Sequence, residues 1–406
     1  MNIAKIRAQF PILKEQMHGY QLIYFDNAAT SQKPQPVLDA LMHFYTKQNA
    51  NVHRGIYTLS EQATYAYESA RDAIAAMINA HNATEIVFTH SATHSINMVA
   101  HAFVLPMIQP GDEIVITELE HHANLLVWQW VCQQKEAQLV YIPVTEDGDI
   151  AYDQLDQIIT HKTKFVAVSS ESNALGTVVD VQRITEKAHA VGASVLVDAS
   201  QTVPHQKVDV QKLDADFLVF SGHKMLAPTG IGVLYAHQRM HERLMPFEYG
   251  GGMLYATTYQ TMQQAKMPYL LEAGTPPVAQ AIALKAACAY LDPFLINNQL
   301  REYESQLTSR LIDGLHMIHG VRILGPVNKL RGYGHMVSFI IEDVHAHDVA
   351  AYLDQFGICV RAGHLCAQPL AQKIGAESMV RASFYLYNTE QEVNRFIDVL
   401  STKNFV

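Results

Sequence analysis

Short runs of β-branched and other apolar residues alternate with longer amphipathic segments over the middle of the chain. Seven such runs are typical of buried strands, and they lie at 85–89, 113–118, 138–144, 164–170, 194–200, 216–222 and 230–235. Helix-like segments lie between several of them, for example at about 124–134 and 181–191. Continuous apolar strands separated by helices indicate a parallel sheet covered on both faces, which binds ligands at the carboxyl ends of its strands. We therefore expect functional side chains directly after strands.

The last third of the chain has a different pattern. A glycine-rich stretch at 250–252 and a Gly-Thr-Pro-Pro turn at 274–277 precede a long helical segment at about 278–319. Strands at 335–343 and 359–363 and a final helix from about Thr389 follow. This pattern predicts a smaller α+β domain that begins near residue 278.

The composition is that of a folded protein and favours small-molecule chemistry. The 406 residues are 49% hydrophobic, which is enough for a large core, and only 17% charged. The formal net charge of −10 disfavours broad binding to nucleic acid or to anionic membranes. The N-terminus lacks the apolar region of an export signal, and apolar stretches such as 98–108 stop well short of the roughly 18 residues of a membrane span. Because the four cysteines form no CxxC pair, we expect a reducing, cytoplasmic location.

Lys224 directly follows the strand at 216–222, in a Ser-Gly-His-Lys sequence. Burial at a strand end makes the cationic form costly and lowers the pKa of the amine from about 10.4, so a free amine becomes available for Schiff-base formation. Asp198 lies in the strand segment at 194–200, and a carboxylate opposite a lysine can hold the ring nitrogen of pyridoxal phosphate protonated. A lysine that reaches solvent and a helix-capping aspartate are the alternatives for each residue alone. Together the two residues favour a pyridoxal-phosphate site.

Two further strand ends carry polar residues suited to this cofactor. His121, in Glu-His-His-Ala-Asn, could stack on the ring and shuttle a proton, and a histidine pair at a helix start is the alternative. Adjacent side chains converge poorly on one ion and no Cys or carboxylate pattern accompanies them, so we expect no metal site. Thr93 and the N–H groups of a helix that begins near Ala92 could hold a phosphate, with Ser221 and His223 as further donors. An ordinary N-cap is the alternative here.

Eight short motifs occur along the chain. They are Tyr-Phe-Asp-Asn-Ala-Ala at 24–29, Asn-Val-His-Arg-Gly at 51–55, Glu-His-His-Ala-Asn at 120–124, Ser-Asn-Ala-Leu-Gly at 172–176, Asp-Ala-Ser-Gln at 198–201, Ser-Gly-His-Lys at 221–224, Glu-Ala-Gly-Thr-Pro at 272–276 and Arg-Ala-Gly-His-Leu-Cys at 361–366. In this order they resemble the group II (Suf-type) cysteine desulfurases, which are fold-type I enzymes of the class V aminotransferase family. The resemblance covers nearly the whole chain.

The resemblance implies an α/β fold with two domains. A large pyridoxal-phosphate domain over residues 21–277 would contain a mixed, mostly parallel sheet covered by helices. A smaller α+β domain over residues 278–406 would carry the Cys366 loop, and the N-terminal helical segment 1–20 would belong to it. The resemblance also implies a homodimer.

The resemblance further implies a role for each residue around the cofactor. Lys224 would bind pyridoxal 5'-phosphate covalently, and Asp198 would pair with the pyridine nitrogen. Gln201 would hydrogen-bond the ring hydroxyl, and His121 would stack on the ring and take part in catalysis. The phosphate would be held by Ala92, Thr93, Ser221 and His223, together with Thr275 of the neighbouring subunit.

On the substrate side, the resemblance implies that Asn173 and Arg381 orient the carboxylate of L-cysteine, or of L-selenocysteine, with His53 and Arg361 also at the substrate. Cys366 would be the nucleophile that takes the sulfur as a persulfide, leaves L-alanine, and passes the sulfur to an acceptor protein for iron–sulfur cluster assembly. A thiol with a pKa of about 8.5 is only slightly ionised at pH 7, so this role needs a cationic or polar setting. The other three cysteines lie in apolar runs and are expected to pack in the core.

The phosphate motif departs from the family pattern. The family has Arg-Gly-Thr-Thr-Glu where this chain has His-Ser-Ala-Thr-His at 90–94. If Ser91 needs the left-handed backbone of a glycine, the change costs about 1 kcal/mol. His94 places a base where the family has an acid, and Ala227 replaces another family glycine. Cofactor affinity or substrate choice is therefore expected to differ, and a selenocysteine lyase, an aminotransferase or a pyridoxal-phosphate-binding protein with degraded activity remain alternatives.

Overall fold

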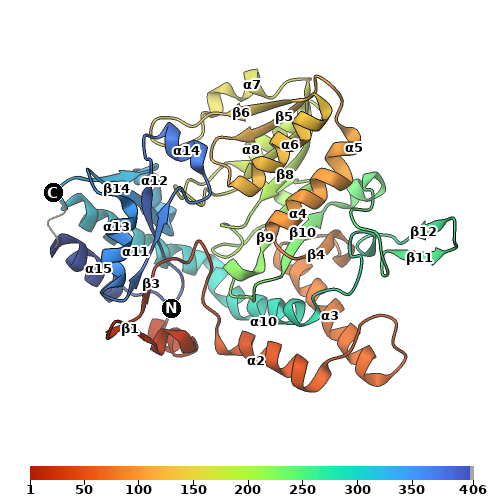
Figure 1. Cartoon of the computed structure of the whole chain (residues 1–406), viewed down its shortest axis with the longest axis horizontal. Helices are drawn as coiled ribbons and strands as arrows, with labels where there is room; N and C mark the ends of the chain where they lie inside the picture. The colour runs from red at the N-terminus through yellow and green to blue at the C-terminus, as the bar shows by residue number, and fades with distance from the viewer. Residues whose placement is uncertain (403–406) are drawn as a thin grey trace.

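Seven strands form the central sheet of the structure, a computed structural model that describes residues 1–402 (Figure 1). In spatial order they are β4 (Ile86–Thr89), β10 (Gly232–Ala236), β9 (Phe217–Ser221), β8 (Ser194–Asp198), β7 (Thr163–Ser169), β5 (Glu113–Thr117) and β6 (Gln138–Ile142). β10 runs antiparallel to both of its neighbours, and all other neighbours pair in parallel. All seven predicted strands are confirmed, and the sheet is mixed and mostly parallel.

The direction of β10 follows from the length of the chain before it. Only residues 222–231 connect β9 to β10, whereas a parallel return needs a crossover of a dozen or more residues. The strand therefore comes back antiparallel, and Gly222 N–H donates to the carbonyl of Ile231 (2.9 Å) at the base of the connection. This short return carries Lys224 at the edge of the sheet where the parallel strands end.

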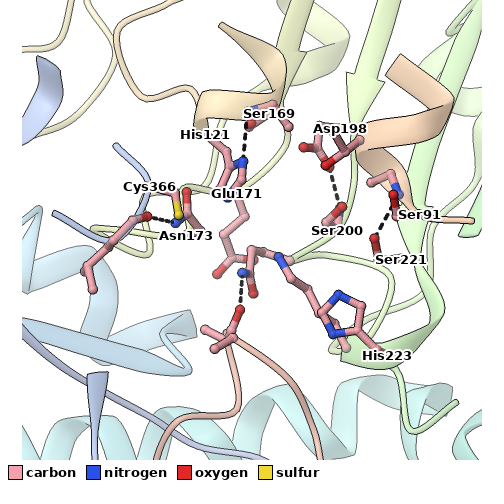
Figure 2. Close-up of a pocket in the computed structure, with 18 of the residues that line it drawn as sticks. Ser91, His121, Ser169, Glu171, Asn173, Asp198, Ser200, Ser221, His223 and Cys366 are labelled. Atoms are coloured by element: carbon pink, nitrogen blue, oxygen red, sulfur yellow. Dashed lines mark hydrogen bonds between the residues drawn. The ribbon is translucent and has the colours of Figure 1, made fainter. Parts of the chain in front are cut away.

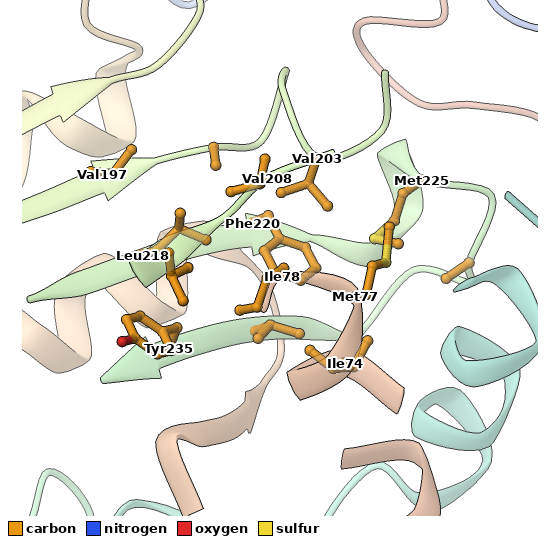
Figure 3. Packing of buried hydrophobic residues seen from close by; sticks show 14 of the residues in the cluster. Ile74, Met77, Ile78, Val197, Val203, Val208, Leu218, Phe220, Met225 and Tyr235 are labelled. Atoms are coloured by element: carbon orange, nitrogen blue, oxygen red, sulfur yellow. The ribbon is translucent and has the colours of Figure 1, made fainter. Parts of the chain in front are cut away.

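Helices cover both faces of the central sheet. α3 (Thr58–Met77), α8 (Val181–Ala190) and α10 (Val278–Leu295) share one buried apolar cluster with it, and α4 (Ala92–Val99) and α6 (Leu126–Lys135) share the other. In β9, Leu218 and Phe220 belong to the first cluster, while Phe217 and Val219 belong to the second. Figure 3 shows Leu218 and Phe220 facing the end of α3. Because both faces are buried, the strand sequences are apolar without alternation.

A second sheet lies in the C-terminal part of the chain. It is antiparallel and consists of β13 (Val321–Leu324), β14 (Met336–Ile341), β17 (Met379–Ser383) and β16 (Arg361–Gly363). Its apolar cluster includes residues of α11 (Gln299–His316), α13 (Ala346–Asp354) and α15 (Glu390–Thr402). The predicted strand at 359–363 is divided, because β15 (Ile358–Cys359) pairs instead with β3 (Ile23–Tyr24), in parallel. The N-terminal segment therefore lies against the C-terminal elements (Figure 1).

The remaining elements are short or lie outside the two sheets. They are α1 (Ile3–Arg7), α2 (Gln35–His43), α5 (Leu105–Met107), α7 (Leu155–Ile158), α9 (Val210–Leu213), α12 (Val327–Tyr333), α14 (Gln368–Lys373), β1 (Gln16–Met17), β2 (Tyr20–Gln21), β11 (Leu254–Thr257) and β12 (Met262–Gln264). The segment 1–20 is only partly helical, since α1 is followed by a short turn at Pro11–Lys14 and by the β1–β2 hairpin. The domain boundary near residue 278 stays a prediction.

The predicted helical stretch at 278–319 is two helices. Asn297 and Asn298 adopt a left-handed backbone (φ 57° and 58°), which ends α10 and starts α11 in a new direction. By length and composition alone, the run Val278–His316 is long and apolar enough to cross a membrane. In the fold, however, α10 packs against α2 and α3 and contributes its apolar side chains to the core.

Candidate active site

A cavity of about 330 Å³ opens at the carboxyl ends of β7, β8 and β9 (Figure 2). This volume is in the range of small-molecule and cofactor sites. The predicted site residues that line it are Ala92, Thr93, His121, Asn173, Asp198, Gln201, Ser221, His223, Lys224, Arg361, Cys366 and Arg381. His53 and Thr275 do not line it. Asp198, Ser221 and Lys224 therefore lie at strand ends of the central sheet as expected, whereas Arg361, Cys366 and Arg381 reach the cavity from the C-terminal sheet and its loop.

The turn that carries Lys224 is anchored through the carbonyl before it. The carbonyl oxygen of His223 accepts hydrogen bonds from Lys33 Nζ (2.9 Å), Ser31 N–H (3.1 Å) and the hydroxyls of Thr30 and Ser31 (3.1 Å each). Desolvation lowers the pKa of Lys33 to about 8. Residues 30–33 thus fix the backbone of the turn directly before Lys224.

The surroundings of Lys224 favour its neutral form. Desolvation lowers the pKa of its amine, and the nearby Arg381 cation acts in the same direction. The charges of Asp198 and Cys366 oppose this shift in part. An amine with a lowered pKa at a strand end suits Schiff-base formation and proton transfer.

Several buried polar atoms around Lys224 have no protein partner. Asp198 is 7% exposed, and its Oδ1 accepts from the N–H of Ser200 (3.0 Å). Gln201 donates through Nε2 to the carbonyl of Ala28 (2.9 Å). This leaves Gln201 Oε1, Ser200 Oγ and Arg381 Nε buried without a hydrogen-bond partner among residues 1–402. Since buried polar atoms are nearly always paired, these atoms and the Lys224 amine fit a polar aromatic ligand such as pyridoxal phosphate.

The N-terminus of α4 forms one end of the cavity. Ser91 caps the helix, because its Oγ accepts from the N–H of His94 (3.2 Å), and Ser221 Oγ accepts from the N–H of Ala92 (2.8 Å). Ser91 has an extended backbone (φ −174°), so the condition for a strain cost at this position is not met. The close approach depends on Gly232 instead, where a Cβ would lie 2.5 Å from the carbonyl carbon of Ser91. Thr93 completes this end of the cavity.

The other two departures from the family motif are also mild in the structure. The His90 and His94 rings stack with centroids 5.0 Å apart. Desolvation, together with His90, lowers the pKa of His94, which is therefore neutral at neutral pH rather than an added cation. In the turn after Lys224, the residue with a left-handed backbone is Leu226 (φ 71°), and Ala227 is not strained in this way.

His121 faces the cavity as a neutral imidazole. Its Nδ1 accepts from the N–H of Ala123 (3.0 Å). Desolvation, with a further contribution from Lys224, lowers the pKa of His121 to about 4. Its protonated nitrogen is therefore Nε2, and the ring can donate one hydrogen bond or move one proton at that atom.

Glu120, directly before His121, was not identified as a site residue from the sequence. Its buried carboxylate accepts from Thr117 Oγ1 (2.6 Å), Asn124 Nδ2 (2.7 Å), Ser169 Oγ (2.6 Å) and Ser169 N–H (3.0 Å). Desolvation raises the pKa of Glu120 to about 6. This carboxylate joins the ends of β5 and β7 and fixes the segment from which His121 projects. An acid between a strand end and a candidate histidine is the signal that could have identified it.

The loop 363–367, which we term the Cys366 loop, closes one side of the cavity. Leu365 and Cys366 both adopt a left-handed backbone (φ 55° and 56°). Asn173 Nδ2 donates to the carbonyl of Leu365 (2.6 Å), and His122 N–H donates to the carbonyl of Cys366 (2.7 Å). Cys366 is exposed and lies beside Asn173 (Figure 2). The loop thus presents its thiol at the cavity opening.

Two arginines meet at Asp26 on the same side. Arg361 Nη2 lies 2.6 Å from Asp26 Oδ2, and Arg381 Nη2 lies 3.3 Å from Asp26 Oδ1. Arg381 also donates through Nη1 to the carbonyl of Asn173 (2.5 Å). Asp26, in the motif at 24–29, was not assigned a role from the sequence. It orients Arg381, whose unpaired Nε remains available to an anionic ligand.

His53 and Thr275 lie together in a second cavity of about 430 Å³. His53 Nε2 contacts Glu68 Oε1 (2.7 Å) there. Within one chain, therefore, the structure does not bring these two predicted residues to Lys224. No group of three or more His, Cys, Asp or Glu side chains placed to hold a metal occurs in the described part of the chain.

The four cysteines differ in their surroundings. Burial raises the pKa of the Cys132 thiol to about 11 and that of Cys288 to about 12, and it also raises the pKa of half-buried Cys359. Cys366 is the exposed one. The contrast favours Cys366 as the reactive thiol.

Comparisons with known proteins agree on one family. The aminotransferase class-V family model matches residues 23–396. A probable cysteine desulfurase of Streptomyces coelicolor is 45% identical over 98% of this chain and 97% of its own length, and one of Synechocystis is 44% identical over 98% and 94%. Among solved structures, a cysteine desulfurase of Thermococcus onnurineus has a TM-score of 0.93 at 38% identity and covers 98% of this chain and 97% of its own. The cysteine desulfurase CsdA of Escherichia coli has a TM-score of 0.91 at 37% identity, with 99% and 98% covered.

Proposed function

The chain belongs to the class V aminotransferase family, and we propose that it is a pyridoxal-phosphate-dependent cysteine desulfurase. The enzyme converts L-cysteine to L-alanine and takes up the sulfur as a persulfide on Cys366. One observation carries this proposal beyond the family: Lys224 and Cys366, which come from the central sheet and from the C-terminal sheet, line the same cavity. A base and an exposed thiol at one site are what the reaction requires.

Residues around the cavity would hold the cofactor at both ends. Lys224 would bind it covalently, Asp198 would face the ring nitrogen, and Gln201 Oε1 would receive the ring hydroxyl. The start of α4 at Ala92 and Thr93, with the hydroxyl of Ser221 and the ring of His223, would hold the phosphate. Because the N–H of Ala92 already donates to Ser221 Oγ, the Ser221 hydroxyl would donate in its place. Bound in this way, pyridoxal phosphate acts as an electron sink that stabilises negative charge at the substrate α-carbon.

Two residues of this chain orient the substrate carboxylate. Arg381 has a free Nε and a backbone contact to Asn173, and both side chains border the Cys366 loop. A carboxylate bound there would leave the α-carbon inside the cavity that Lys224 also lines. Burial lowers the pKa of the Lys224 amine and so favours its neutral form. Lys224 would therefore remove the α-proton and later return a proton to the product.

Cys366 performs the sulfur transfer. Its thiolate attacks the sulfur of the substrate, the bond between that sulfur and the β-carbon breaks, and the electron pair remains with the carbon fragment. Protonation of that fragment gives L-alanine. The net change is one thiol and one L-cysteine to one persulfide and one L-alanine, so no external oxidant is required. His121, which carries its proton on Nε2, would donate that proton or a hydrogen bond during these steps.

We further propose that the enzyme is a homodimer in the cytoplasm. His53 and Thr275 would reach the Lys224 cavity of the partner. This is supported by exposed apolar side chains near them, since Tyr255 borders the same cavity and Ile56 lies three positions after His53, and exposed apolar surface is typical of an interface. The persulfide would pass to an acceptor protein that serves iron–sulfur cluster assembly. L-selenocysteine, which differs from L-cysteine only in having selenium in place of sulfur, is the alternative substrate that we propose.

The test is to incubate the purified holoenzyme with L-cysteine and to analyse both products. We expect L-alanine in solution and one added sulfur atom on the peptide that contains Cys366, detected by mass spectrometry before reductant is added. A Cys359→Ala variant is the matched control, and it should retain both products. Absence of L-alanine, or sulfur carried by another cysteine, would overturn the proposal.

A further inference from the structure

Five buried polar side chains form a network beside the Lys224 cavity, and each is at most 6% exposed. They are Glu171 after β7, His205 after β8, Arg301 and Glu304 on α11, and His335 before β14. Glu171 also lines the cavity (Figure 2), whereas the other four do not. The network therefore joins the active-site edge of the central sheet to the C-terminal sheet and its helix.

The contacts are centred on one ion pair. Arg301 Nη2 donates to both carboxylate oxygens of Glu171 (2.9 Å each). His335 Nδ1 lies 3.0 Å from Arg301 Nη1 and 3.0 Å from Glu171 Oε1, so it contacts both members of the pair. The ring of His335 stacks on that of His205 with centroids 3.8 Å apart. His205 Nδ1 in turn lies 2.8 Å from Glu304 Oε1.

This network is an inefficient way to stabilise the fold. Arg301 Nε, Glu304 Oε2 and His335 Nε2 are buried without a hydrogen-bond partner among residues 1–402. Burial raises the pKa of Glu304 well above its ordinary range, which disfavours the charged form. Buried ion pairs of this kind contribute no more stability than apolar residues of the same volume. A role in positioning the neighbouring site residues explains the arrangement better.

The pair lies between the two segments that carry the substrate-carboxylate residues. Glu171 precedes Asn173 by two positions, and the Asn173 side chain holds the Cys366 loop. On the other side, the carbonyl of His335 accepts from the N–H of Phe384 (2.7 Å), which directly follows β17 with Arg381 on it. Arg301, through Glu171 and His335, therefore contacts both segments.

We propose that Glu171 and Arg301 are a positioning pair, which holds Asn173 and Arg381 in register so that the substrate carboxylate is gripped and the Cys366 loop stays closed. This inference rests on the proposed function for its kinetic consequence, but its structural consequence does not need the cofactor. Neither residue takes part in bond making.

The test uses three variants, Glu171→Gln, Arg301→Met and the double variant, with Glu304→Gln as the matched control. Each single variant leaves one buried group without its partner and lowers the unfolding midpoint in urea. Each is expected to raise the KM for L-cysteine about fivefold to tenfold with a smaller change in kcat, as the loss of one positioned hydrogen bond would. In the full chain without cofactor, each single variant should also raise the alkylation rate of Cys366 by about fivefold. Peptide mass spectrometry measures this rate.

The double variant separates positioning from folding. It removes both charges, so we expect the unfolding midpoint to return toward the original value while the raised KM and the faster alkylation of Cys366 persist. If the unfolding midpoint, the KM and the alkylation rate of the double variant all return to their original values, the pair is purely structural and the inference is overturned. A single variant that folds and keeps both the original KM and the original alkylation rate would also overturn it. Glu304→Gln keeps the side-chain size and an oxygen that can contact His205, and it leaves the Glu171–Arg301 pair intact. The unfolding midpoint, the KM and the alkylation rate should therefore stay near those of the unaltered protein.

Failure of the proposed function gives a different result. In that case the unaltered holoenzyme makes no L-alanine from L-cysteine. The alkylation of Cys366, which needs neither cofactor nor turnover, still compares the variants and still tests the positioning pair.

Discussion

The turn that carries Lys224 and the loop that carries Cys366 face one cavity but are held in opposite ways. The Lys224 turn follows a strand of the central sheet, and the carbonyl before it accepts four hydrogen bonds from residues 30–33. The Cys366 loop follows a strand at the edge of the C-terminal sheet, and its thiol is exposed. Two of its residues in succession have a left-handed backbone, which costs about 1–2 kcal/mol for each residue.

This difference matches what each group must do. A base works best when its position is fixed, and the burial that lowers the pKa of the Lys224 amine favours the neutral form that accepts a proton. A sulfur carrier must approach the substrate and then present the persulfide outside, so an exposed thiol on a loop with stored backbone strain suits it. The loop is nevertheless anchored, since the carbonyls of Leu365 and Cys366 each accept one hydrogen bond. The comparison therefore assigns rigidity to the Lys224 side and adaptability to the Cys366 side.

The largest effect is expected for Lys224→Ala. The variant should lose the visible absorbance band of the bound cofactor, and its turnover should fall at least about a thousandfold, because one amine supplies both the covalent link and the base. Absorbance spectra and L-alanine release measure the two effects. Lys212→Ala, which removes an exposed lysine, is the control. Alanine has no amine that could bind the cofactor covalently. An unchanged absorbance band in Lys224→Ala would therefore contradict the assignment of Lys224.

Cys366→Ala should separate the two sides of the cavity. We expect turnover of L-cysteine to be lost to a similar extent while the absorbance band remains, because the loop does not carry the cofactor link. The same two measurements apply, with Cys359→Ala as the control that keeps both. Continued production of L-alanine by Cys366→Ala would remove the nucleophile from the mechanism.

Much of the Lys224 side could be predicted from the sequence, since strand periodicity locates the strand ends and a parallel sheet brings those ends together. Asp198, Ser221 and Lys224 follow from this argument, and the structure places all three on one cavity. The antiparallel direction of β10 was not predicted from strand periodicity, although the short interval between the predicted strands at 216–222 and 230–235 already excludes a parallel return.

Contacts between distant segments were less predictable. Glu171 and Arg301 are 130 positions apart, and no local pattern relates them. The contacts of Asp26 with Arg361 and Arg381 could not be predicted for the same reason, although the motif that contains Asp26 was identified. The break between α10 and α11 depends on two asparagines with a left-handed backbone, a conformation that sequence periodicity does not report. His53 and Thr275 stay predictions for the Lys224 site, because one chain does not contain the contacts they would make.

Asn173→Ala tests how firmly the Cys366 loop is held. The variant loses the hydrogen bond from Nδ2 to the carbonyl of Leu365 and one contact to the substrate carboxylate. We expect the KM for L-cysteine to rise about tenfold and single-turnover persulfide formation to slow by a similar factor, while the cofactor band is unchanged. Asn82→Ala, at an exposed turn that borders neither cavity, should match the unaltered enzyme. An unaltered KM in Asn173→Ala would show that the loop and the substrate are held by other groups.

The smallest effect concerns the histidines on the rigid side. Desolvation, with Lys224 nearby, lowers the pKa of both His121 and His223 to about 4, against about 6.5 in an unfolded chain. Below pH 6.5 the unfolded chain therefore binds more protons at these two histidines than the folded chain does. The contribution of His121 and His223 to stability is complete above pH 6.5 and is lost as the pH falls toward 4. Between pH 7.5 and 5.5 each histidine should lower the free energy of unfolding by about 1 kcal/mol. His189, whose pKa is raised by its hydrogen bond to Asp216, acts in the opposite sense.

Urea unfolding of the full chain without cofactor, at pH 7.5, 6.5 and 5.5, measures this loss. His121→Asn should reduce the difference between pH 7.5 and 5.5 by about 1 kcal/mol, because the variant lacks one group that gains a proton on unfolding. His161→Asn, which removes an exposed histidine, serves as the control for a generic loss of imidazole. If His121→Asn and the unaltered chain lose stability equally, the imidazole at the cavity is already protonated or well hydrated. The neutral ring that the Lys224 side requires would then be absent.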